Sequence, residues 1–219
     1  MSPFICLANS NKNGGRCIAG KDLDSYKWIR PVSDSVTGEL SLLQYCYENG
    51  REPNLLDIVG VTLKEPKPQA GQPENHLIAA SEWKYYGTFP KKEIARLCDE
   101  PENLWMLDYK ADRVSSNTVI SGGINQSLYL IKPDQAILSV GLEYGKLKVR
   151  ANFNYKGQAY SLVVTDPNYL IINTIGSYPL CQNTYLTISL GQEFKGYCYK
   201  LVAGIIEPNS SYTGKNIVY

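Results

Sequence analysis

The sequence has very few of the residues on which common catalytic and metal sites depend. His76 is the only histidine in 219 residues, and none of the six cysteines belongs to a C-x-x-C pair. Imidazole is the usual general base, nucleophile activator and metal ligand, so its scarcity disfavours those sites. The scattered carboxylates have no ligand-like spacing. We therefore expect no metal and no cofactor, and recognition of a ligand rather than catalysis.

Long apolar runs and an excess of charge are also missing. No run approaches the roughly 18 residues of a membrane-spanning helix, and the start Met-Ser-Pro-Phe-Ile-Cys-Leu lacks the basic region of a signal peptide. With all six cysteines in apolar or strand-like surroundings, this predicts a cytoplasmic protein with free thiols and no membrane partner. The formal net charge of +1 provides no overall field for a polyanion, so any contact with nucleic acid needs a local basic patch.

Aromatic and cationic residues are abundant, with 17 tyrosines, 3 tryptophans and 22 lysines and arginines. They lie in short runs rich in Val, Ile, Tyr and Thr that glycine and proline interrupt, which is typical of short antiparallel strands. We expect a mainly β protein of two tandem OB-like Greek-key barrels with a few short helices, divided into domains 1–112 and 124–219. The polar stretch 110–126 is the predicted link, and the predicted helices are 90–98 and, less regularly, 41–48. The predicted strands are 4–8, 16–22, 28–31 and 56–64 in the first domain, and 127–131, 136–141, 146–155, 158–165, 184–190 and 197–207 in the second.

Two predicted strands of the second domain show which face is buried. In 146–155, apolar residues alternate with Lys146, Lys148 and Arg150, which predicts one core face and one solvated basic face. In 197–207, Tyr197 and Tyr199 share one face and the alternate residues share the other. We assign the tyrosine row to the core.

The first domain offers a possible anion cradle. Asn9, Lys12 and Arg16 flank a glycine pair in a predicted hairpin loop, where backbone N–H groups and two cations could hold a phosphate. No nucleotide-binding consensus is present, because the residues after the loop are typical of a strand rather than a helix. A plain hairpin connection is the alternative interpretation.

Two further groups in the first domain could recognise a base. Trp28 and Arg30 point to the same side of one strand, which suits stacking of a base next to a phosphate contact. The alternative is a half-buried tryptophan covered by the aliphatic stem of the arginine. Gln72 and Asn75 lie in a loop and could read an adenine-like edge, or could serve only in capping and turns.

Several short segments carry a resemblance to a known family. They are Ile5-Cys-Leu-Ala-Asn-Ser, Gly15-Arg-Cys-Ile-Ala-Gly, Trp28-Ile-Arg-Pro-Val-Ser, Gln72-Pro-Glu-Asn, Leu186-Thr-Ile-Ser-Leu-Gly and Gly196-Tyr-Cys-Tyr-Lys-Leu-Val-Ala. The chain resembles the prokaryotic dual OB-fold-containing domain over nearly its whole length. This resemblance implies two OB-like barrels, a bacterial or archaeal cytoplasmic protein, and recognition of nucleic acids or nucleotides in mobile-element defence or conflict systems. It implies no catalytic residues.

The resulting functional hypothesis is a binding module for single-stranded nucleic acid or a nucleotide. The predicted ligand-binding residues are Asn9, Lys12, Arg16, Trp28, Arg30, Gln72, Asn75, Lys146, Lys148 and Arg150. One alternative is a nucleotide-processing or nucleic-acid-modifying enzyme that uses carboxylates and lysine without histidine, which predicts a concave pocket holding such groups. Another is an adaptor for a protein partner, which predicts a broad apolar, tyrosine-rich surface.

Overall fold

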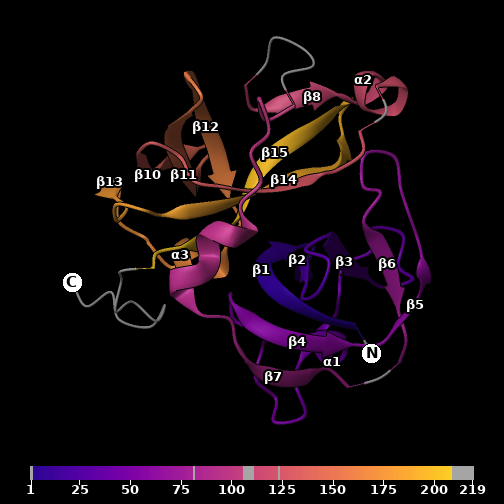
Figure 1. Ribbon diagram of the computed structural model, residues 1–219. Coiled ribbons are helices and arrows are strands. Elements are labelled where there is room, and N and C mark those ends of the chain that lie inside the picture. The colour runs from indigo at the N-terminus through magenta and orange to yellow at the C-terminus, as the bar shows by residue number, and fades with distance from the viewer. Residues whose placement is uncertain (1, 81, 106–110, 123, 209–219) are drawn as a thin grey trace. The chain divides into compact units, whose positions relative to one another are not determined.

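The computed structural model describes residues 2–80, 82–105, 111–122 and 124–208, and the chain forms two compact units. The first comprises Met1–Leu97 with Gly123–Leu128, and the second comprises Cys98–Gly122 with Tyr129–Tyr219. Each unit is built around one sheet, of seven and eight strands respectively (Figure 1). The predicted mainly β class with few short helices is confirmed. The unit bounds differ from the predicted division at 112–124, because residues 98–112 group with the second unit.

The first unit contains seven strands and two short helices. The strands are β1 (Ser2–Lys12), β2 (Gly15–Asp22), β3 (Trp28–Val32), β4 (Asp57–Val61), β5 (Leu63–Pro66), β6 (Asn75–Ile78) and β7 (Lys84–Thr88). The helices are α1 (Leu42–Tyr45) and a 3-10 helix η1 (Lys91–Leu97). Both lie inside the ranges 41–48 and 90–98 for which the sequence predicts helices.

The strands of the first unit follow the connectivity of an OB barrel. β1, β2 and β3 form an antiparallel meander, β3 pairs in parallel with β6, and β5 pairs with β6 in antiparallel fashion. β4 pairs with β1, and only Thr62 separates β4 from β5. β5, at one end of the strand order, is therefore joined by one residue to β4, which lies next to β7 at the other end, and the sheet curls back on itself.

The interior of the first barrel is filled by apolar side chains from the inward face of each strand. Phe4, Ile18, Val59 and Trp83 are all at most 1% exposed, and Trp83 meets Phe4 edge to face. Gly20 on β2 allows the closest strand approach, because a Cβ there would lie 1.9 Å from the carbonyl oxygen of Ile5. Only glycine fits between these two strands.

The second unit contains the remaining strands and two short helices. The strands are β8 (Arg113–Ser115), β9 (Leu128–Ile131), β10 (Ala136–Glu143), β11 (Lys146–Tyr155), β12 (Gln158–Val164), β13 (Gly176–Pro179), β14 (Tyr185–Phe194) and β15 (Tyr197–Ile206). The helices are α2 (Ser116–Ser121) and α3 (Pro167–Leu170). The described part of the predicted link 110–126 thus contains β8, which pairs with β15, followed by α2.

The second unit repeats the connectivity of the first. β10, β11 and β12 form an antiparallel meander, β12 pairs in parallel with β15, and β15 pairs with β14. α3 lies in the chain between β12 and β14, as a helix does between the third and fourth strands of an OB barrel. The expected pair of OB-like barrels is therefore present. None of the described helices is long and apolar enough to cross a membrane.

Side-chain alternation on β11 and β15 decides which groups face outward. On β11, Val149, Ala151 and Phe153 are buried as predicted, and the lysines lie on the outer face. On β15 the prediction for the tyrosine row is wrong: Tyr197 and Tyr199 are only partly buried, whereas Cys198 and Lys200 point inward. Lys200 is 1% exposed and its ammonium lies 5.9 Å from the ring centroid of Tyr160, so the one charged residue of this strand marks its core face.

Candidate functional site

In the first barrel, the predicted anion cradle is occupied by contacts within the protein. The Lys12 ammonium donates to the carbonyl of Thr37, and burial lowers the pKa of this lysine. Arg16 forms an ion pair with Glu52 at 3.0 Å, and the Asn9 amide donates to the carbonyl of Pro53 at 2.8 Å. These three side chains hold the β1–β2 hairpin against the loops that follow β3 and α1. No arrangement of N–H groups around an open anion space results.

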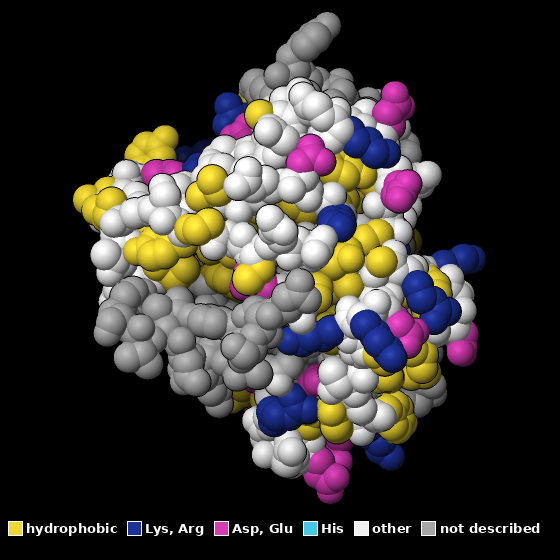
Figure 2. All heavy atoms as spheres, turned by 60° about the vertical axis from the view of Figure 1, so that its left-hand side comes forward, with side chains coloured by type: hydrophobic (Ala, Val, Ile, Leu, Met, Phe, Trp, Pro, Cys, Tyr) yellow, Lys and Arg dark blue, Asp and Glu magenta, His cyan; other side chains and the backbone are white. Residues whose placement is uncertain are grey.

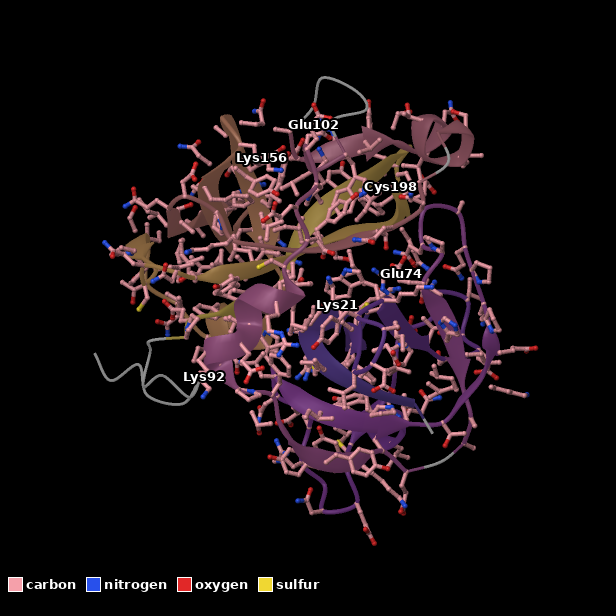
Figure 3. All side chains as sticks on the ribbon, viewed as in Figure 1. Lys21, Glu74, Lys92, Glu102, Lys156 and Cys198 are labelled. Carbon is pink, nitrogen blue, oxygen red and sulfur yellow. The ribbon has the colours of Figure 1, made fainter. Side chains whose placement is uncertain are left out.

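Trp28 and Arg30 lie on the outward face of β3, but that face is covered. Trp28 is 7% exposed. The ammonium of Lys21, a residue labelled in Figure 3, lies 5.3 Å from the Trp28 ring centroid and donates to the carbonyl of Leu97 at 2.8 Å. Leu97 ends η1, so this hydrogen bond ties the end of the helix to Lys21 on β2. The structure therefore agrees with the alternative interpretation of a buried tryptophan and not with an open stacking platform, although the side chain that lies over the Trp28 ring is Lys21 and not Arg30.

Arg30 is the centre of a buried polar network. Its guanidinium, in a side chain that is 2% exposed, forms an ion pair with Glu74 at 3.2 Å and donates to the hydroxyl of Ser127 at 3.0 Å and to the Asn75 amide oxygen at 3.4 Å. Glu74 also accepts from the Ser127 hydroxyl and its backbone N–H. Asn75 donates to Gln72 at 3.4 Å. The structure therefore brings together Arg30, Gln72 and Asn75, which the sequence analysis placed in two separate groups, in a buried cluster that also contacts Ser127.

The outer face of the second barrel is solvated, and it carries the predicted basic strand. Lys146 and Lys148 are exposed on β11. Arg150 is engaged, since its Nε and Nη2 atoms donate to the two carboxylate oxygens of Glu143 at 2.6 and 3.0 Å. This bidentate contact lowers the pKa of Glu143 and raises that of Arg150. The free positive charge of this face therefore comes from the lysines.

A pocket of about 700 Å³ lies on this outer face, over β11 and β12. Its polar lining is mostly amide and hydroxyl, from Gln135, Asn152, Asn154 and Ser161. Asn152 is held by neighbours on both sides, donating to the Ser139 hydroxyl at 2.9 Å and accepting from the Ser161 hydroxyl at 2.8 Å. This ladder crosses β10, β11 and β12, so the amide is oriented before any ligand arrives. Arg150 and Asp112 complete the polar lining.

A row of aromatic and cationic side chains continues the same face from Asp112. The next residue, Arg113, lies opposite Tyr199 in the β8–β15 pairing, and its guanidinium carbon is 4.9 Å from the ring centroid of Tyr197 and 5.7 Å from that of Tyr199. Phe194 on β14 is 59% exposed, and its ring centroid lies 6.4 Å from that of Tyr199. The guanidinium thus lies near two tyrosine rings and forms an ion pair with Asp112 at 3.6 Å, and the arginine side chain is 33% exposed. We call Arg113, Phe194, Tyr197 and Tyr199 the aromatic row.

Charges of both signs are mixed on the surface of the molecule. Figure 2 shows lysine and arginine side chains interspersed with aspartate and glutamate on one face, as the net charge of +1 leads one to expect. A strong field of one sign is therefore not the basis of recognition on that face. Among the described residues, no three His, Cys, Asp or Glu side chains gather as they would around a metal ion.

The sequence of residues 3–205 matches the family model of the dual OB-containing domain. The chain belongs to this family. The match covers both barrels, which confirms the suspected family and identifies the protein as an OB-fold binding module. Among curated proteins, none matches the sequence.

In this member of the dual OB-containing domain family, sequence reasoning missed most of the open site. Arg113 lies in a polar stretch that was interpreted as a link, and the tyrosines of β15 were assigned to the core. The alternation on β11 did place Asn152 on the solvated face, but a single asparagine there carries no functional signal. Arg113 reaches Tyr197 and Tyr199 only because β8 pairs with β15, and no local pattern in the sequence indicates this pairing.

Proposed function

We propose that the second barrel binds single-stranded nucleic acid on the outer face of β10, β11 and β12. OB barrels use the face of their second and third strands for oligonucleotides, and β11 and β12 hold those positions here. The observation that carries the proposal is the amide-lined pocket on those strands, continued by the aromatic row. The corresponding face of the first barrel is covered and carries Trp28 and Arg30 in buried positions.

The chemistry of the site suits an unpaired base. The hydrogens of the Asn152 amide and of the Ser161 hydroxyl are engaged within the barrel, so their oxygens can accept hydrogen bonds from the N–H groups of a base edge, which is free only in a single strand. A base can stack on the open side of the Arg113 guanidinium or on Phe194, and each such stack contributes about 1 to 3 kcal/mol. Lys146 and Lys148 lie at the end of β11 and supply phosphate contacts. A role in conflict between prokaryotic cells and mobile elements, which the resemblance implies, would rest on this binding.

Fluorescence anisotropy with labelled oligonucleotides of about 12 nucleotides tests the proposal, since OB folds occupy roughly 4 to 16 nucleotides. We expect single-stranded DNA or RNA to bind and the duplex of the same sequence to bind at least tenfold more weakly. Because only a few lysines contact phosphate, the logarithm of the binding constant should fall with log salt at a slope of about −1.5 to −2. Failure of every single-stranded oligonucleotide to bind at low salt refutes the proposal.

Two variants localise the binding. Arg113→Ala should weaken binding about 5- to 150-fold through loss of stacking, and Lys148→Glu should flatten the salt slope. Arg96→Ala is the matched control, because Arg96 is 61% exposed and its ion pair is with Glu93 on η1 of the first barrel. Equal losses in Arg96→Ala and Arg113→Ala would mean that the aromatic row is not the site.

A further inference from the structure

A second pocket of about 700 Å³ lies on the first barrel. The turn after β3, the helix α1 and the strand β6 surround it, and its lining residues come from 33–34, 42–50, 64 and 77–82 among the described positions. It contains none of the ten residues that the sequence analysis singled out. The ligand face of an OB barrel is formed by the second and third strands, so this pocket lies outside that face.

The pocket is lined by apolar side chains that the fold leaves uncovered. Leu42 and Leu43 on α1 are 58% and 96% exposed, and Leu77 and Ala79 are partly exposed. Burying a leucine side chain stabilises a protein, and two adjacent exposed leucines bring this fold no such gain. Scattered surface leucines are ordinary, but a contiguous apolar lining around a concavity is typical of an interaction site.

The exposed leucines are held in place by the local structure. α1 is only four residues long, too short to be stable alone. Ser41 fixes its start by donating its backbone N–H to the Gln44 side-chain oxygen at 2.9 Å, and Tyr45 buries the opposite side of the turn in the barrel core. The leucines therefore point outward from an anchored turn, and a ligand need not order them.

The rim of the pocket is acidic. Asp34, Glu48 and Glu82 are exposed, and none of them forms an ion pair with another described residue. Lys64 is the one cation in the lining, and the nearby Lys67 ammonium donates to the carbonyl of Ser33 at 3.1 Å. An apolar floor with an excess of carboxylates repels phosphate and attracts cations, so this pocket has the opposite preference from the proposed nucleic-acid site.

We propose that this pocket binds a segment of a partner protein in which apolar side chains are flanked by lysine or arginine. The apolar side chains bury Leu42, Leu43 and Leu77, and the cations pair with the carboxylates of the rim. The protein then has two independent sites, one for a basic-apolar polypeptide on the first barrel and one for a polyanion on the second. This inference does not depend on the proposed nucleic-acid function.

An array of fluorescent nine-residue peptides tests the inference with the full chain. Each peptide contains two leucines, isoleucines or valines, separated by one to three residues and flanked by lysines. Control arrays replace the lysines by glutamate or the apolar residues by serine. We expect saturable binding of lysine-flanked peptides at low salt, at least tenfold weaker binding of both controls, and weakening as salt rises. Absence of saturable binding, or equal binding of the glutamate array, overturns the inference.

Matched variants place the binding at the pocket. Leu43→Ser and the double change Asp34→Asn with Glu48→Gln should each reduce peptide affinity about five- to tenfold. Leu142→Ser on the second barrel, where the leucine is 64% exposed, and Asp24→Asn, an exposed carboxylate outside the pocket, should leave it unchanged. All of these positions are at the surface, so folding is preserved. Equal effects of pocket and control variants overturn the assignment. So does oligonucleotide binding that Leu43→Ser abolishes, since the pocket would then serve nucleic acid.

Discussion

The assignment of Arg30 to the architecture of the first barrel can be tested by removing its partner. Glu74→Ala would leave a guanidinium that is 2% exposed without the carboxylate at 3.2 Å, and would also remove the acceptor of the Ser127 hydroxyl. Removing one member of a buried pair typically costs about 3 to 5 kcal/mol, because the remaining charge is buried and uncompensated. We expect a loss of stability of that size, confined to the first unit.

Urea denaturation followed by tryptophan fluorescence measures this loss, since Trp28 and Trp83 are buried in the first unit. Each unit can unfold separately, so the curve is fitted for two transitions. The double variant Arg30→Met with Glu74→Leu should recover most of the loss, because an apolar pair replaces a buried ion pair at little cost. Arg96→Ala, which breaks an exposed ion pair with Glu93, should cost less than about 1 kcal/mol.

The opposite outcome has a clear meaning. If Arg30 were kept for a phosphate, Glu74→Ala would free its guanidinium, strengthen oligonucleotide binding and cost little stability. A loss below about 1 kcal/mol, equal to that of Arg96→Ala, together with tighter oligonucleotide binding, would refute the structural role and restore Arg30 to the ligand site.

Three other predictions follow from single contacts. Gly20→Ala should lower the free energy of unfolding by at least about 2 kcal/mol in thermal or urea unfolding, because the new Cβ would lie 1.9 Å from a backbone oxygen. Gly141→Ala is the control: no atom lies within 4 Å of its new Cβ, so stability should change by less than about 1 kcal/mol. Burial raises the pKa of Tyr155 to about 12, so the unfolded chain ionises first, and stability that is present below pH 10 is lost as pH rises to 12. Tyr155→Phe should reduce this loss between pH 10 and 12, measured as the difference from wild type in urea midpoints. Glu143→Gln should release Arg150 from its ion pair, strengthen oligonucleotide binding about three- to tenfold and steepen the salt slope by about 0.7. Anisotropy titrations that stay unchanged would exclude Arg150 from the site.

Local patterns in the sequence were sufficient for much of the fold. The strict alternation of β11 predicted its buried face, and Lys156 and Gly157 after it adopt the positive φ values of 48° and 79° that a tight hairpin needs. Glycine and proline positions marked most strand ends in both units. These features depend on neighbours within a few residues, which is why they can be read without a structure.

The site was harder to predict because burial of an outward-facing residue depends on distant segments. A tryptophan and an arginine on one strand face look alike whether the face is open or covered. Here the ammonium of Lys21, which donates to Leu97 at the end of η1, lies over the ring of Trp28, and Ser127, 97 positions away in the sequence, accepts a hydrogen bond from Arg30. Such contacts leave no periodic signal in the strand itself.

Comparison of the same strands in the two barrels supports a division of roles. β2 and β3 place Lys21, Trp28 and Arg30 on the outward face, and all three are nearly inaccessible. β11 and β12 occupy the same places in the second barrel, and their outward face carries Lys148, which is exposed, and Asn152, which lines the pocket. A covered face cannot bind a strand of nucleic acid unless the contacts that cover it break, among them those of Lys21 with Leu97 and of Arg30 with Ser127. The proposed binding of nucleic acid on the second barrel therefore requires no rearrangement, and the proposed peptide site on the first barrel uses a surface that its own segments leave free.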